Sequence, residues 1–228
     1  MKISVVISAQ SEWDGVKLLF PEVQAGHYIY GECLETTIQH FPLTFFHLGW
    51  GKTASAGALQ YILDSEKPDL VVNLGTCGGF AGVVNQRDVI LVEQTFIYDI
   101  VELMDSADVT DYYASSLDLS WLAEPYPFPV RRGIIASADS DLLPDKIPLL
   151  KSKGVIAADW ESASLAWVAQ KNNARLLILR AVSDLVSEEG GEVYNQMDVY
   201  KERTKKIMEK LANQLPGWLR SIPSLRAY

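Results

Sequence analysis

Acidic and hydroxyl side chains stand at the ends of several apolar runs of the sequence. Glu12, Thr76, Glu161 and Asp184 each occupy such a position, and residues 137–141 add a cluster of serines and aspartates. Because open α/β sheets bind ligands at the carboxyl ends of their strands, these side chains are candidates for one site. Crowded or buried carboxyl groups shift their pKa and then serve as proton donors or as acceptors from hydroxyls. Each acid alone could instead complement a helix dipole or lie in a solvated turn.

The stretch 71–80, Val-Val-Asn-Leu-Gly-Thr-Cys-Gly-Gly-Phe, has the composition of a ligand-binding strand end. Its apolar start predicts a central strand covered by helices on both faces. Gly75 to Gly79 are then expected to break the strand. Small residues there, Gly78 among them, let backbone amides and the Thr76 hydroxyl approach a ligand closely. A tight turn without a ligand has the same glycine content.

Strand and helix patterns alternate along the chain, which is typical of an α/β protein. Residues 105–116 are polar and are expected to form a loop or lid. There is no repeat, low-complexity segment or linker, so we expect one domain over residues 1–228. The expected strands are residues 2–9, 28–32, 36–40, 43–48, 70–74, 88–98, 132–137, 155–158 and 176–181, and the expected helices are residues 11–20, 53–63, 163–170 and 194–215.

Charge and composition exclude several classes of function. The 228 residues carry a formal charge of −9, which argues against binding nucleic acid or an anionic membrane surface. Two cysteines are too few for a disulfide framework, and no Cys/His cluster has the spacing of a zinc site. Residues 1–9 are too short for a signal sequence or a membrane span. We therefore expect a cytoplasmic protein that binds a small molecule and uses no metal or organic cofactor.

Four motifs resemble one known superfamily. They are Gly49-Trp-Gly-Lys52, Asn73-Leu-Gly-Thr-Cys-Gly-Gly79, Asp159-Trp-Glu161 and Arg180-Ala-Val-Ser-Asp184. Together they resemble the nucleoside phosphorylases and nucleosidases, most of all the 5′-methylthioadenosine/S-adenosylhomocysteine nucleosidases. The resemblance spans Met1 to about Leu215. We expect the corresponding fold, a three-layer α/β/α sandwich around a central twisted mixed sheet, and the resemblance implies a homodimer.

The resemblance implies a catalytic role for each acid. Asp184 would be the general acid that protonates or hydrogen-bonds N7 of a leaving purine. Glu12 would orient or deprotonate the attacking water. Glu161 would bind ribose hydroxyls, a contact that strengthens as the sugar becomes oxocarbenium-like. Thr76, in place of a serine, would keep a hydroxyl near the ribose and the nucleophile.

The resemblance also assigns residues that bind the nucleoside. Ser183 would support the base site, and Trp160 would pack on the nucleoside. Trp50 replaces a small aliphatic residue beside the 5′ substituent and would reshape that pocket. Asp141 falls near a base-stacking phenylalanine; it cannot stack, but it can accept a hydrogen bond from an amine or ring N–H.

The nucleophile is predicted to be water. A phosphate nucleophile needs cationic donors, most often arginine, and Asn73 stands where related phosphorylases have an arginine. The predicted activity is therefore hydrolysis of the N-glycosidic bond of a purine nucleoside. One alternative is a phosphorylase that takes its arginine from Arg131, Arg132 or a neighbouring subunit. Another is a nucleoside-binding protein without turnover. A Rossmann dehydrogenase would require a GxGxxG motif that the first strand lacks.

Overall fold

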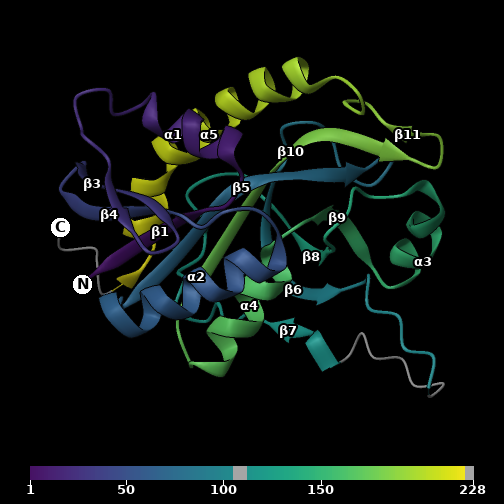
Figure 1. Ribbon diagram of the computed structural model, residues 1–228, viewed down its shortest axis with the longest axis horizontal. Helices are drawn as coiled ribbons and strands as arrows, with labels where there is room; N and C mark the ends of the chain where they lie inside the picture. The colour runs from purple at the N-terminus through teal and green to yellow at the C-terminus, as the bar shows by residue number, and fades with distance from the viewer. Residues whose placement is uncertain (105–111, 224–228) are drawn as a thin grey trace.

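The computed structural model describes residues 1–104 and 112–223. Within these residues no helix is both long and apolar enough to cross a membrane. The helices are α1 (Gln10–Lys17), α2 (Gly51–Glu66), α3 (Ile147–Ser152), α4 (Ser162–Lys171) and α5 (Met197–Arg220), with a short 3-10 helix, η2, over Pro144–Lys146 (Figure 1). The strands are β1 (Ile3–Ile7), β2 (Gly26–Tyr28), β3 (Gly31–Ile38), β4 (Phe41–His47), β5 (Leu70–Phe80), β6 (Val89–Ile97), β7 (Ser115–Ser116), β8 (Arg131–Ser137), β9 (Val155–Asp159), β10 (Leu176–Ser187) and β11 (Gly190–Gly191).

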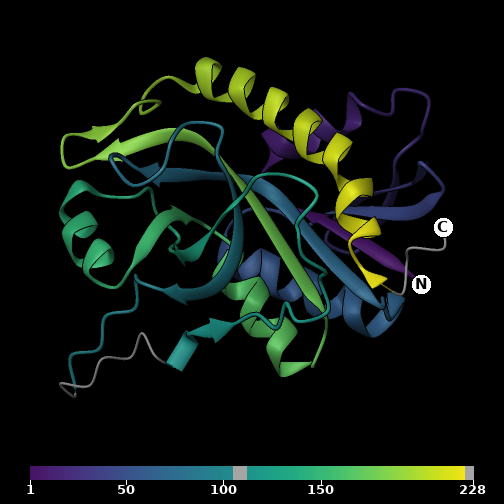
Figure 2. The same ribbon diagram turned by 180° about the vertical axis from the view of Figure 1, so that it is seen from behind.

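Helices cover both faces of the central sheet. Helices α1 and α5 pack on one face, and α2 and α4 pack on the other (Figures 1 and 2). Side chains alternate between these faces along each strand: Val72 joins the core beneath α5, whereas its neighbour Val71 joins the core beneath α2. Because both faces are buried, the central strands β5 and β10 begin as continuous apolar runs. The predicted three-layer α/β fold with a mixed sheet is confirmed.

Part of the sheet closes on itself, which the sequence did not indicate. Strand β5 pairs with β1, β9 and β10, and β10 pairs with β5 and β6. Since β8 joins β6 to β9, the strands β5, β9, β8, β6 and β10 form a ring. The two long strands β5 and β10 therefore belong both to the ring and to the open sheet.

The expected breaks in β5 and β10 are wrong. Strand β5 continues through its glycines to Phe80, and β10 continues through Asp184 to Ser187. The two strands pair in parallel from Leu176 opposite Val71 to Val186 opposite Phe80, with an irregularity at Ser183. Backbone pairing along the whole stretch outweighs the low strand propensity of glycine. The bulge at Ser183 redirects the side chains on either side of it, as bulges next to active sites do.

Other element boundaries also differ from the expectation. Helix α3 was not predicted, because six residues are too few for a clear helical period. Helix α5 begins at Met197 and continues past Pro216 to Arg220, whereas residues 194–215 were expected. Of the expected loop 105–116, residues 105–111 lie outside the described residues, and Ser115–Ser116 form β7 against β6.

Candidate active site

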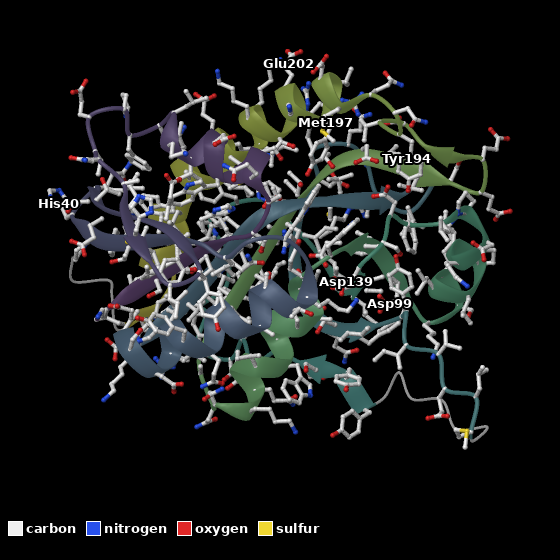
Figure 3. All side chains as sticks on the ribbon, in the orientation of Figure 1. His40, Asp99, Asp139, Tyr194, Met197 and Glu202 are labelled. Atoms are coloured by element: carbon white, nitrogen blue, oxygen red, sulfur yellow. The ribbon has the colours of Figure 1, made fainter. Side chains whose placement is uncertain are left out.

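A cavity of about 550 Å3 opens where β5, β9 and β10 meet the first turns of the helices. Its walls include residues from the start of α1, the turn before α2, the end of β9 and the segment that leads into α5. Tyr194 and Met197 come from that last segment and from the first turn of α5 (Figure 3). The nine residues assigned to the site from sequence all line the cavity: Glu12, Trp50, Thr76, Gly78, Asp141, Trp160, Glu161, Ser183 and Asp184. The fold brings them together, and their individual roles stay predictions.

Arg180 lies beneath the cavity as a fully buried cation. Its Nε is 2.9 Å from Asp159 Oδ2, its Nη1 is 3.8 Å from Glu12 Oε1, and its Nη2 is 3.6 Å from Glu161 Oε2. The three carboxylates come from α1 and from the end of β9, so the guanidinium joins distant parts of the chain. A buried charge is tolerated only when it is paired in this way. Among the described residues, Nη2 has no hydrogen-bond partner.

Gly75 makes room for this arrangement. A Cβ atom at Gly75 would lie 2.1 Å from Arg180 Nη1 and 2.9 Å from Glu12 Oε1. Both distances are far inside van der Waals contact, so only glycine fits opposite Arg180 in the β5–β10 pairing. The glycine content of this stretch serves close packing against a side chain as well as access to a ligand.

Glu12 is held by hydrogen bonds on both carboxylate oxygens. Oε1 accepts from the Thr76 amide at 2.6 Å and from the Thr76 hydroxyl at 2.8 Å. Oε2 accepts the Ala9 amide at 3.2 Å, a helix-capping contact, and keeps lone-pair capacity. The Thr76 oxygen is also 3.1 Å from the Tyr200 hydroxyl of α5, and burial raises the pKa of Tyr200 to about 12. Because the single hydroxyl proton of Thr76 is donated to Glu12, the neutral tyrosine is the donor in this contact and fixes the threonine.

Glu161 is buried in the same cluster, and its Oε1 accepts the Gly51 amide at 3.2 Å. Burial raises the pKa of Glu161 to about 8, a shift that Arg180 opposes and that Asp159 and Glu12 reinforce. Asp159 itself is fully used by the protein: it accepts from the amides of Glu161 and Ser162 and from the hydroxyls of Ser137 and Ser162. Both acids line the cavity, but only Glu161 keeps carboxyl oxygen capacity free for a ligand.

Asp184 also lines the cavity and comes directly after the bulge in β10. Burial raises the pKa of its carboxyl, and the hydrogen bond that the Ser183 hydroxyl donates to Oδ1, at 2.6 Å, works against this shift. Asp184 therefore combines a strand position facing the cavity with an increased tendency to hold a proton. That combination is what a general acid needs.

Trp50, Trp160 and Asp141 also line the cavity. The indoles of Trp50 and Trp160 stack with ring centroids 5.5 Å apart and an interplanar angle of 16°. Trp50 remains 63% exposed, so a large part of its ring is open to a ligand or to solvent. Asp141 is exposed and borders the cavity. The stacked pair adds aromatic surface to a cavity whose charged lining residues, among those described, are all acidic.

Cations are missing from the cavity wall as far as the described residues go. Five carboxyl groups line the wall, from Glu12, Asp141, Asp159, Glu161 and Asp184, and no lysine or arginine among the described residues does. The two arginines considered for phosphate point elsewhere: Arg131 pairs with Asp88, and Arg132 pairs with Glu93 and Glu124. Asn73 is buried in the sheet and donates to the Val6 carbonyl at 2.9 Å.

No role was predicted from sequence for Arg180, Asp159 or Tyr200. A signal for the first was available, because Arg180 interrupts an apolar strand that is buried on both faces. Such a charge requires buried partners of opposite sign. Tyr200 carried no comparable signal, since a tyrosine on an amphipathic helix is usually part of the core.

Comparison with known proteins agrees with this geometry. A family model described as the phosphorylase superfamily matches residues 19–213. The chain belongs to the phosphorylase superfamily. Among curated relatives of this superfamily member, a 5′-methylthioadenosine/S-adenosylhomocysteine nucleosidase of Haemophilus influenzae is 28% identical over 204 residues, which cover 81% of this chain and 86% of the relative. The nucleosidase of Bacillus licheniformis is 27% identical over 162 residues, 65% of this chain and 70% of the relative.

Solved structures place the fold in the same group. The Streptococcus pneumoniae nucleosidase, solved with a transition-state inhibitor, superposes with a TM-score of 0.75 at 21% identity. The superposition covers 97% of this chain and 99% of the Streptococcus pneumoniae chain. A Helicobacter pylori nucleosidase mutant with 5′-methylthioadenosine in its active site superposes with a TM-score of 0.76 at 16% identity. The superposition covers 94% of this chain and 98% of the mutant's chain. The predicted resemblance of this superfamily member to the nucleosidases is confirmed.

Gly75→Ala tests the close packing of β5 against Arg180. The added methyl group must displace the guanidinium, so we expect the free energy of unfolding in urea to fall by about 3 kcal/mol, at the upper end for overpacked sites. Gly26→Ala is the matched control, because its nearest atom would lie at an ordinary 3.4 Å. Equal stability of the two variants would contradict the need for glycine at position 75.

Glu161→Gln tests the proton on Glu161. Because the folded-state pKa is raised to about 8 from 4.5, the folded protein binds more protons than the unfolded chain between these pH values. This group therefore makes the free energy of unfolding fall as pH rises through that window. Glutamine removes the effect, so the stability of the variant relative to wild type should increase from pH 4.5 to 8 in urea titrations. Glu209→Gln, on the surface of α5, is the control for replacing a glutamate elsewhere. If the control-corrected difference in stability between Glu161→Gln and wild type stays constant from pH 4.5 to 8, Glu161 does not retain its proton in the folded state.

Proposed function

We propose that this protein hydrolyses the N-glycosidic bond of a purine nucleoside of the methylthioadenosine or S-adenosylhomocysteine type and releases the free base. The observation that carries the proposal is a cavity lined by five carboxyl groups and, among the described residues, by no lysine or arginine. The names of the curated relatives support the same activity. Single-domain organisation over residues 1–228 is part of this proposal.

Asp184 acts in this proposal as the general acid. The Ser183 hydroxyl donates to Oδ1, which leaves Oδ2 to carry the proton that burial favours. That proton moves to N7 of the purine as the bond between the sugar and the base breaks, and the bonding electrons leave with the base. Ser183 and Gly78 shape the base side of the cavity, and Asp141 accepts a hydrogen bond from an amine or ring N–H of the base.

Glu12 activates the attacking water. Its Oε1 is occupied by Thr76, whereas Oε2 accepts the Ala9 amide alone. Oε2 can therefore take a proton from water as the oxygen adds to the anomeric carbon. Thr76 fixes the direction of this carboxylate and keeps its hydroxyl beside the ribose.

Glu161 holds the ribose. It accepts from ribose hydroxyls, and these contacts strengthen as positive charge develops on the sugar ring. A wall of carboxyl groups with few countercharges stabilises such a cation electrostatically. Trp50 and Trp160 pack on the nucleoside at the rim and set its 5′ preference.

Water is favoured over phosphate by charge. The buried guanidinium already faces the acidic side chains of Glu12, Asp159 and Glu161 and does not line the cavity. It therefore has no free charge to offer a phosphate dianion, whose binding uses cationic donors such as arginine. A phosphorylase would need an arginine from a neighbouring subunit. We also propose a homodimer in the cytoplasm without a nucleic-acid or membrane partner; the formal charge of −9 supports the last point.

Product analysis of wild type and Asp184→Asn tests the proposal. Methylthioadenosine, S-adenosylhomocysteine, adenosine and inosine are each incubated with and without phosphate, and free base and sugar are measured. We expect at least one of them to yield equal base release in both buffers. Asparagine cannot supply the acidic proton, so we expect kcat for Asp184→Asn to fall by about 10² to 10⁴.

Asp64→Asn, which changes an exposed aspartate on α2, is the control and should keep wild-type kcat. Ribose-1-phosphate formed only with phosphate would contradict hydrolysis and support the phosphorylase alternative. Tight nucleoside binding without any base release would support a binding protein instead.

A further inference from the structure

Lys52 forms a half-buried ion cluster just outside the cavity. Its Nζ lies 2.6 Å from Asp99 Oδ2 and 3.1 Å from Asp139 Oδ2, and its side chain is only 15% exposed. Asp99 follows β6 and Asp139 follows β8, and Figure 3 shows the two aspartates next to each other. The lysine thus ties the first turn of α2 to the ends of two strands of the ring.

Asp139 also caps α2 from a distance. The N-cap residue Trp50 offers no side-chain hydrogen bond. Instead, Oδ1 of Asp139 accepts the Lys52 amide at 2.7 Å, and the Asp139 amide donates to Asp99 Oδ2 at 2.8 Å. Gly51 has φ of +81°, and a Cβ there would lie 2.7 Å from Asp139 Oδ1. A side chain at position 51 would therefore collide with the Asp139 carboxylate, and glycine avoids this collision.

The same turn supplies two features of the active site. The Gly51 amide donates to Glu161 Oε1 at 3.2 Å, and the neighbouring Trp50 stacks on Trp160. Lys52 itself does not line the cavity, and its charge is matched by two carboxylates. It is therefore placed to act on the site through the turn and is not placed to bind a substrate anion.

We propose that Lys52 is a positioning residue: through Asp99 and Asp139 it fixes the turn 49–52, and this turn orients Glu161 and holds Trp50 against Trp160. The proposal rests on the proposed function for its catalytic consequence. Without the lysine, two neighbouring aspartates repel each other and Asp139 moves off the α2 amides. Glu161 then loses its Gly51 donor, and the indole pair separates.

The test combines kinetics with a spectroscopic signal that needs no turnover. Stacked indoles produce an exciton couplet in far-ultraviolet circular dichroism, which reports the Trp50–Trp160 pair directly; Trp50→Phe identifies its contribution. For Lys52→Met we expect loss of this couplet and a fall in kcat/KM on the order of 10-fold or more, as for small misplacements of binding groups. Lys52→Arg keeps the charge and should retain the couplet and most of kcat/KM.

A double-mutant comparison separates positioning from general destabilisation. If Lys52 acts through Glu161, adding Lys52→Met to Glu161→Gln should lower kcat/KM less than it does in wild type. Lys17→Met is the matched control, because Lys17 also lies between two carboxylates, Asp14 and Glu32, and does not border the cavity. It should leave both the couplet and kcat/KM unchanged.

Two results would contradict the proposal that Lys52 positions the active site through the turn. An intact couplet in Lys52→Met, or unchanged kcat/KM despite a lost couplet, would overturn it. If Lys52→Met does not fold, Asp99→Asn takes its place, because it removes one ion-pair partner at similar volume, and the same two readouts apply. Should wild type release no base, the proposed function fails, whereas the couplet still shows whether Lys52 holds the turn.

Discussion

The pairing of one buried guanidinium with three acidic side chains is the constraint on which the rest of the site depends. Without Arg180, the acidic groups of Glu12, Asp159 and Glu161 would be buried together with no countercharge, and such an arrangement is strongly unfavourable. The guanidinium in turn requires the space left by Gly75 and the parallel pairing of β5 with β10. Fold and site are therefore linked through a single side chain, which no ligand needs to touch.

This charge balance also shapes the chemistry that the cavity supports. Because Arg180 is buried behind the acids that it pairs with, the charged side chains that line the cavity among the described residues are all acidic. Such a wall favours a reaction in which the sugar gains positive charge and disfavours an anionic nucleophile. Burial divides the work among the acids: Asp159 is occupied by protein donors, whereas the raised pKa of Asp184 suits it to carry a proton. The buried charge pairing therefore favours water over phosphate as the nucleophile in the proposed reaction.

Local sequence patterns were sufficient to place the acids at one edge of the sheet, because apolar runs mark the strands and polar residues mark where they meet the cavity. Local patterns do not show which strands pair with each other, so the pairing of strands far apart in sequence could not be predicted. The closed ring, the continuation of β5 through Gly75 and the bulge at Ser183 all depend on which strand lies beside which. The ion cluster of Lys52 with Asp99 and Asp139 joins three segments that are far apart in sequence. Arg180 was the one such feature that an isolated charge in an apolar strand could have indicated.

A double-mutant cycle on Arg180 and Asp159 tests the central role of the buried charge cluster most directly. The free energy of unfolding in urea is measured for wild type, Arg180→Met, Asp159→Asn and the double variant. We expect Arg180→Met alone to lose about 3–5 kcal/mol, because it leaves buried carboxylates unpaired. Asp159→Asn should then cost less in that background than in wild type, with a coupling of about 0.5–3 kcal/mol. Strictly additive effects, or wild-type stability of Arg180→Met, would contradict the account.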